Sequence, residues 1–121
     1  EKGSEINFMY AGLSGEGGFN AANDGAETWI IGGGFDQRWL APDNTIASVM
    51  KACDGSIHDL TAMYLNGELN KGDTFNWGVK EGGIYLVMSE DIVPADIVAT
   101  INDYQAKVAS GDITVTEFRP E

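Results

Sequence analysis

Residues 30 to 37 read Ile-Ile-Gly-Gly-Gly-Phe-Asp-Gln, an apolar strand that runs into successive glycines and then into a carboxylate and an amide. This pattern is typical of an α/β protein in which a buried strand ends at a ligand crevice. Ligands lie outside the carboxyl ends of parallel strands, because backbone N–H groups and loop side chains converge there. Glycine lets the backbone come close to a ligand. The pattern therefore predicts a binding cleft and not a catalytic triad.

Two further segments share this layout. The strand-like sequence INFMYA at 6–11 opens into the glycine-rich loop 12–18, and residues 45–51 form an apolar run that ends at Lys51. A strand at 6–11, a short helix at about 19–24 and a strand at 28–31 make a βαβ unit, which implies parallel pairing. We therefore expect an α/β domain, a parallel sheet with flanking helices.

The second half of the chain predicts further helices and strands. Proline is tolerated in a first helical turn, and glycine commonly ends a helix. The expected elements are a strand at 45–51, a helix at 54–66, two short strands within 74–88 joined by a hairpin-like connection at 80–83, a helix from Pro94 to Gly111, and a last strand at 113–118.

Composition narrows the classes of partner. The 121 residues suit one domain, and 7 basic against 19 acidic residues give a net charge of −12. Such a chain repels nucleic acid and anionic membranes, so we expect no nucleic-acid partner. No apolar stretch in the sequence approaches the roughly 20 residues of a membrane span.

The motifs that carry catalysis are missing from the sequence. The loop 12–18 has neither the spacing nor the lysine of a P-loop, and it does not fit the dinucleotide fingerprint. Ser14 is not in a nucleophile elbow, because glycine follows it immediately. The lone Cys53 excludes an internal disulfide, and His58 is the single histidine. We therefore predict no catalytic residue, no metal site and no cofactor.

Two long segments carry a family resemblance. The sequences EINFMYAGLSGEGGFNAAND and WIIGGGFDQRWLAPDNTIASVMKACD resemble the basic membrane protein family, the purine-nucleoside-binding lipoproteins of bacterial ABC importers. In that family a strand leads into a glycine loop, a second strand ends in Asp-Gln, and a Leu-Ala-Pro-type turn precedes a strand ending in Lys. The resemblance continues through GVKEGGIYLV and VPADIVATINDYQAKVASGDITV, so it covers nearly the whole chain.

This resemblance implies a fold and a role. The fold is that of type I periplasmic binding proteins, two α/β lobes hinged around a ligand, present here in part. Residues 1–121 are then the C-terminal portion, with a hinge crossing near 35–39 and a missing N-terminal portion. The role is the solute-binding component of an ABC importer that takes a nucleoside-like small molecule to an ABC permease without catalysis. The location is periplasmic or extracytoplasmic, with lipid anchoring through a missing N-terminal segment as one option.

The same resemblance implies a ligand site. Phe8 matches an aromatic on which a base stacks, although a core phenylalanine fits the sequence equally well. Gly12 and Leu13 match the loop whose backbone approaches the ligand. Lys51 matches a lysine that meets the ligand's polar groups, where a solvated strand end is the alternative.

One position departs from the family pattern. Aligning Asp36 and Gln37 with the family's closing Asp-Gln places Gly34 where a ribose-gripping aspartate is expected. Glycine cannot make a carboxylate-to-diol contact. Either Asp36 takes over that contact, or the ligand is not an ordinary ribonucleoside.

Two other functions fit the sequence. The first is an α/β enzyme domain that uses the glycine loops for a nucleotide or a sugar phosphate, and steady turnover would distinguish it from a binding protein. The second is a ligand-sensing domain that signals to a membrane partner, which genomic neighbours would separate from a transporter component.

Overall fold

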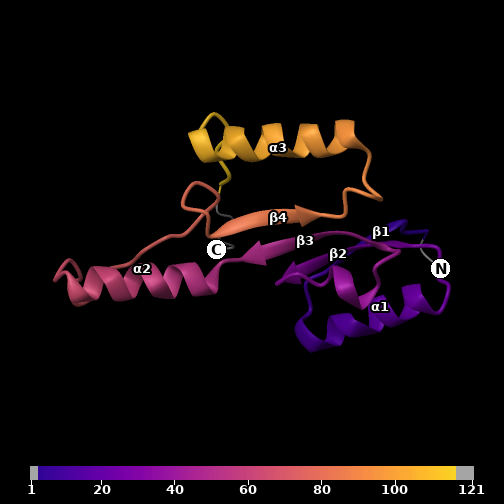
Figure 1. The fold of residues 1–121 in the computed structure, drawn as a ribbon, viewed down its shortest axis with the longest axis horizontal. Helices are drawn as coiled ribbons and strands as arrows, with labels where there is room; N and C mark the ends of the chain where they lie inside the picture. Colours follow the sequence, from indigo (N-terminus) through magenta and orange to yellow (C-terminus); the bar gives the residue numbers. More distant parts are fainter. Residues whose placement is uncertain (1–2, 117–121) are drawn as a thin grey trace.

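A single sheet organises the chain. The computed structural model describes residues 3–116. In chain order the elements are β1 (Ile6–Met9), the short 3-10 helix η1 (Gly12–Gly15), α1 (Glu16–Asn23), β2 (Trp29–Gly34), the short 3-10 helix η2 (Arg38–Leu40), β3 (Thr45–Lys51), α2 (Cys53–Leu65), β4 (Ile84–Met88) and α3 (Ala95–Ser110). The four-stranded sheet has the order β1-β2-β3-β4 (Figure 1).

The sheet is mixed, within the expected α/β class. β1, β2 and β3 are parallel, with Met9 opposite Gly32 and Gly33 opposite Val49. β4 is antiparallel to β3, with Ile84 opposite Lys51. The connection after α2 returns to the edge where β3 ends, because the Ala52 N–H donates to the Gly83 carbonyl at 3.0 Å. The next strand therefore starts at the carboxyl edge and runs in the opposite direction.

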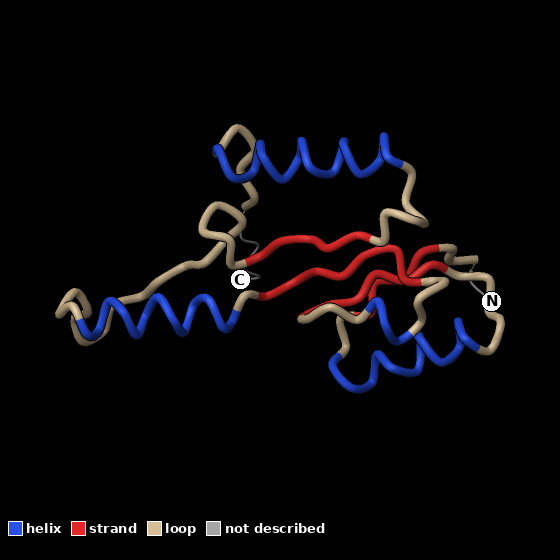
Figure 2. The backbone as a smooth tube through the Cα atoms, viewed as in Figure 1, coloured by secondary structure: helices blue, strands red, loops and turns tan. Residues whose placement is uncertain are grey.

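The helices α1 and η2 lie against one face of the sheet (Figure 2), and a small core packs between them and β2. Its buried members are Phe19, Ala22, Ile30 and Ala41, with Met9 and Leu40 packed against them. Phe19 and Ile30 are 1% and 0% exposed, and burying side chains of this size contributes about 1.5–3 kcal/mol each. Packing on this face holds the strands in place and so fixes where their carboxyl ends lie.

The glycine loop expected at 12–18 is mostly helical. The chain turns into η1 directly at Gly12, and α1 begins at Glu16, so the helix starts earlier than the expected 19. A Cβ at Gly18 would lie 2.6 Å from the Met9 Sδ atom, so the end of the Met9 side chain would have to shift to admit it. Gly18 therefore serves the packing of α1 on β1 and does not break the helix.

Two of the expected strands do not form within the described residues. Within 74–88 only the second strand forms, as β4, and residues 74–78 pair with no strand. The Gly83 N–H donates to the Gly78 carbonyl at 2.8 Å, so a tight turn closes immediately before β4. The last strand, expected at 113–118, is absent over 113–116, and 117–118 lie outside the described residues. The strands at 6–11, 28–31 and 45–51 and the helix after Pro94 are confirmed.

The helices α2 and α3 bury little of their apolar surface against the described residues. α2 extends past the end of β3, away from the sheet (Figure 1). Its Ile57, Tyr64 and Leu65 side chains are 65%, 71% and 77% exposed. α3 lies over β4, and its Tyr104 is 57% exposed. Neither helix has a buried residue.

We expect the isolated 121-residue chain to self-associate, because exposed apolar side chains on one helix favour burial against another copy. Ile57→Lys combined with Tyr64→Lys should shift the chain towards monomer in sedimentation velocity. His58→Lys combined with Ala62→Lys is the control, since it adds the same charge to other exposed positions of α2. A monodisperse wild-type monomer would contradict this prediction.

Candidate functional site

The carboxyl ends of the parallel strands border an open cavity of about 370 Å³. Tyr10 follows β1, Gly33 and Gly34 end β2, and Lys51 ends β3. The cavity is lined by Tyr10, Gly12, Gly33, Gly34, Phe35 and Lys51. Its position agrees with the general rule that α/β sheets bind ligands beyond the carboxyl ends of their strands.

Aromatic rings and one ammonium group form the face of this cavity. The rings of Phe8 and Tyr10 stack with centroids 5.6 Å apart and planes 28° apart. The Lys51 Nζ lies 4.8 Å from the centroid of the Tyr10 ring, within the range of a cation–π contact. Contact with the Tyr10 side chain raises the pKa of Lys51 above its ordinary value, so Lys51 is an ammonium at neutral pH.

The glycines at the end of β2 make this arrangement sterically allowed. A Cβ at Gly33 would overlap the Tyr10 ring, so only glycine lets that ring lie across β2. Gly34 has φ of +101°, a region that side-chain-bearing residues rarely adopt. No atom lies within 4 Å of a Cβ built at Gly34, so its backbone, and not its space, selects glycine.

A buried polar network holds the same loop from the opposite face of the sheet. The Gly33 N–H donates to the Gln37 Oε1 at 2.8 Å, and the Gln37 N–H donates to the Ser48 Oγ at 3.0 Å. Gln37 and Ser48 are 5% and 0% exposed. A Cβ at Gly32 would lie 2.8 Å from the Ser48 Oγ, so this glycine gives the network its room.

Asp36 is engaged by Arg38. Its Oδ1 accepts a hydrogen bond from the Arg38 Nε at 2.9 Å, and its Oδ2 accepts one from the Arg38 Nη2 at 2.8 Å. The ion pair is therefore bidentate. The Arg38 Nη1 also donates to the Met88 carbonyl at 2.8 Å. Hydrogen bonding from Arg38 holds the pKa of Asp36 below its usual value, against a smaller opposing effect of burial.

The structure gathers some of the residues named from the sequence and separates others. Gly12, Gly34 and Lys51 line one cavity. Phe8 stacks on the Tyr10 ring but is not itself part of the lining. Leu13 is 84% exposed and also lies outside the lining. Asp36 lines a neighbouring cavity of about 630 Å³.

Three lining residues were not singled out from the sequence: Tyr10, Gly33 and Phe35. The sequence carried a signal for Tyr10, since it lies two residues after Phe8 and shares its face of the strand. Phe35 follows the glycines directly.

The sequence matches, over residues 2–118, the family described as ABC transporter substrate-binding protein, PnrA-like. The chain belongs to this family. Basic membrane protein C of Borreliella burgdorferi is 33% identical to it over 112 residues, which cover 91% of the chain and 32% of that relative. Basic membrane protein D of the same species is 44% identical over 92 residues, covering 74% of the chain and 27% of that relative. This PnrA-like chain thus spans about a third of the length of these relatives.

A solved structure confirms the fold of this PnrA-like chain. A solute-binding protein of an ABC transporter system from Aeropyrum pernix K1 superimposes with a TM-score of 0.74 at 21% identity. The match covers 93% of the chain and 40% of that protein. The chain therefore has, in part, the expected α/β fold of a periplasmic binding protein.

Within residues 3–116, no group of three or more His, Cys, Asp and Glu side chains is arranged to hold a metal ion. Among the described helices, none is both long and apolar enough to cross a membrane.

Gln37→Met should destabilise this PnrA-like chain by about 1–3 kcal/mol, because it leaves the half-buried Gly33 N–H without its acceptor and Gln37 itself is only 5% exposed. Urea denaturation would measure the loss. Gln105→Met is the matched control: it removes an acceptor for the Leu86 N–H, at 3.2 Å and half-buried, and should cost less. Equal costs would show that the Gln37 network is not special.

The Asp36–Arg38 pair should make stability depend on pH in the acid range. Because the folded-state pKa is lowered, the contribution is complete above the ordinary pKa of 3.8 and is lost as the pH falls through the lowered value. The side chains are 40% and 35% exposed, so screening limits the contribution to about 1 kcal/mol.

The comparison of Asp36→Asn with wild type by urea denaturation at several pH values tests this dependence. The difference in stability should shrink as the solution is acidified. The same substitution in an Arg38→Met background is the control, because the partner that lowers the pKa of Asp36 is then absent and the pH dependence should be smaller. A difference that grows on acidification would contradict the sign of the effect.

Proposed function

We propose that this chain is part of the solute-binding component of an ABC importer, and that the cavity lined by Tyr10, Gly34 and Lys51 forms one wall of its ligand cleft. The observation that carries the proposal is the convergence of three strand ends on a glycine-lined cavity, in a chain of the PnrA-like substrate-binding family. The described site offers binding groups and no nucleophile with an orienting base. A binding role without catalysis is therefore the function that the geometry supports best.

The proposed ligand is nucleoside-like. The exposed ring of Tyr10, backed by Phe8, offers a stacking surface for a planar base. Lys51 adds N–H donors at the rim for oxygen or nitrogen acceptors on the ligand. Gly12, Gly33 and Gly34 let the ligand approach the backbone. Leu13 and Asp36 lie outside this cavity, so we assign the ligand contacts to Tyr10 and Lys51 first.

The rest of the cleft is proposed to come from another part of the same protein. Relatives about three times as long leave room for a second lobe, and residues 1–121 correspond to the C-terminal portion in this reading. A hinge near 35–39 stays a prediction. In the described chain this segment runs from the end of β2 into η2, and β3 follows in the same sheet. Ligand contacts on both lobes would favour the closed form. An ABC permease would recognise that form on the extracytoplasmic side of the membrane.

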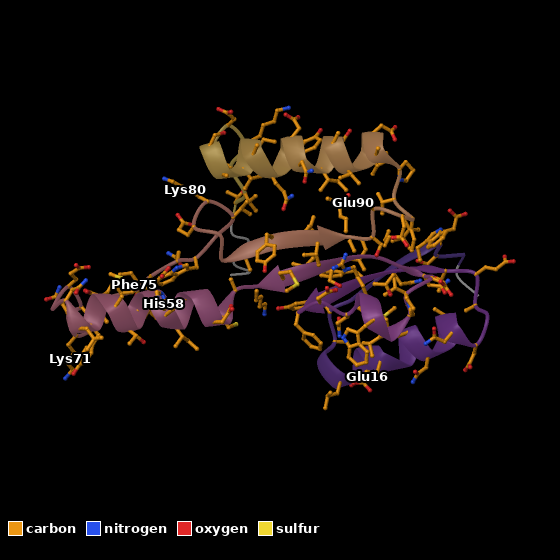
Figure 3. All side chains as sticks on the ribbon, in the orientation of Figure 1. Glu16, His58, Lys71, Phe75, Lys80 and Glu90 are labelled. Atoms are coloured by element: carbon orange, nitrogen blue, oxygen red, sulfur yellow. The ribbon has the colours of Figure 1, made fainter. Side chains whose placement is uncertain are left out.

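Calorimetric titration of nucleosides into the protein as its gene encodes it tests the binding role. Tyr10→Ala should weaken binding about tenfold or more, roughly 1.4 kcal/mol, because the stacking surface is lost. Lys51→Met should weaken it about fivefold or more through the loss of an N–H donor. His58→Ala is the control: Figure 3 shows His58 on α2, away from the sheet, and affinity should stay within about twofold.

Two outcomes would contradict the binding role. The first is a protein that binds no nucleoside, base or sugar in these titrations. The second is steady conversion of the ligand during prolonged incubation, because a solute-binding protein should return its ligand unchanged.

A further inference from the structure

Gly33 lies where the pairing of β1 with β2 stops. The register of these two strands ends at Met9 opposite Gly32, one residue earlier. Just beyond that point, the Gly33 N–H donates a hydrogen bond to the Gln37 Oε1 at 2.8 Å. The side chain of Gln37 is 5% exposed. Gln37 therefore supports the backbone of β2 at the residue where β1 no longer does.

The segment that carries Gln37 is itself fixed to two other strands. The Gln37 N–H donates to the Oγ of Ser48 on β3 at 3.0 Å, and Ser48 is 0% exposed. The next residue, Arg38, donates from its Nη1 to the Met88 carbonyl of β4 at 2.8 Å. Because these bonds tie the segment to β3 and β4, the Gln37 Oε1 is a fixed acceptor and Gly33 must stay close to it.

On the other face of the sheet, the Tyr10 ring rests on Gly33. A Cβ built at Gly33 would overlap this ring, so the ring lies directly against the glycine backbone. The Lys51 Nζ in turn lies 4.8 Å from the centroid of the Tyr10 ring. Tyr10 and Lys51 both line the cavity. A displacement of Gly33 would therefore move the surface on which this wall of the cavity is built.

We propose, resting on the binding role above, that Gln37 is a positioning residue that fixes Tyr10 and Lys51 in the cavity through the backbone of Gly33. Gln37 is not part of the cavity lining, and it acts from the opposite face of the sheet. Its amide oxygen is the group that matters, since this atom accepts the Gly33 hydrogen bond. Ser48 supports it by holding the Gln37 backbone.

NMR of the protein as its gene encodes it, with ¹³C-labelled lysine, tests the geometry of the wall. An aromatic ring shifts the resonances of protons that lie over it, so the ε-methylene protons of Lys51 report the contact with Tyr10. Gln37→Met should move this resonance towards that of a lysine without a ring contact. Gln37→Glu keeps an acceptor oxygen and should leave it near its wild-type position. Lys107 is the internal control: its Nζ lies 5.5 Å from the Tyr104 ring centroid on α3, and its resonance should not change.

Calorimetric titration with inosine tests the consequence for binding. Gln37→Met should weaken the affinity about fivefold or more, and Gln37→Glu should weaken it less than about twofold. Phe19→Leu is the control for stability, because it loosens the core under α1 and leaves the Gln37 hydrogen bonds in place. Its affinity should stay within about twofold of wild type, although urea denaturation shows a loss of stability. Equal losses of affinity in Gln37→Met and Gln37→Glu would contradict the role of the acceptor oxygen.

Ser48→Ala decides the question if Gln37→Met does not fold. It removes the acceptor of the Gln37 N–H and should move the Lys51 resonance in the same direction. A Lys51 resonance that keeps its wild-type position in every folded variant overturns the proposal. An affinity loss in Phe19→Leu as large as that in Gln37→Met also overturns it, because general destabilisation then accounts for the effect. A wild-type protein that binds neither inosine nor any other nucleoside counts against the binding role instead, and the lysine resonances still test the positioning.

Discussion

The three glycines that end β2 are the constraint on which the rest of this site depends. Successive residues of a strand point to opposite faces of the sheet. Gly32 makes room on one face for Gln37 and Ser48, and Gly33 makes room on the other for the Tyr10 ring. Gly34 then turns the backbone through a conformation that other residues avoid. The polar support and the aromatic wall can therefore occupy opposite sides of the same strand end.

The sequence predicted the parts of the fold and site that follow from local periodicity. The strands at the start of the chain, the helix after Pro94 and the convergence of Gly12, Gly34 and Lys51 follow from alternation, helix signals and the common edge of parallel strands. The pairing of Asp36 with Arg38 was not predicted, because it depends on how the loop folds back against Met88. The first of the two strands expected within 74–88 does not form, because a turn at 78–83 closes directly before β4.

The two faces of the sheet differ in how well the chain covers them. α1 and η2 bury Ile30 completely, whereas Ile6 and Phe8 on β1 and Tyr10 just after it stay 54%, 54% and 53% exposed. An α/β sheet commonly carries helices on both faces. The exposed stripe on β1 leads directly to Tyr10 in the cavity, so whatever lies against this face also borders the cavity.

The junction between β3 and α2 has a mechanical consequence. Only Ala52 separates Lys51 from the first residue of α2, and the helix of 13 residues extends away from the sheet (Figure 1). At 1.5 Å per residue, its far end lies about 20 Å from its base. At that length, a rotation of about 5° at the base would move the far end by about 2 Å. A change in backbone direction at the end of β3 would therefore be larger at the far end of α2 than at its base.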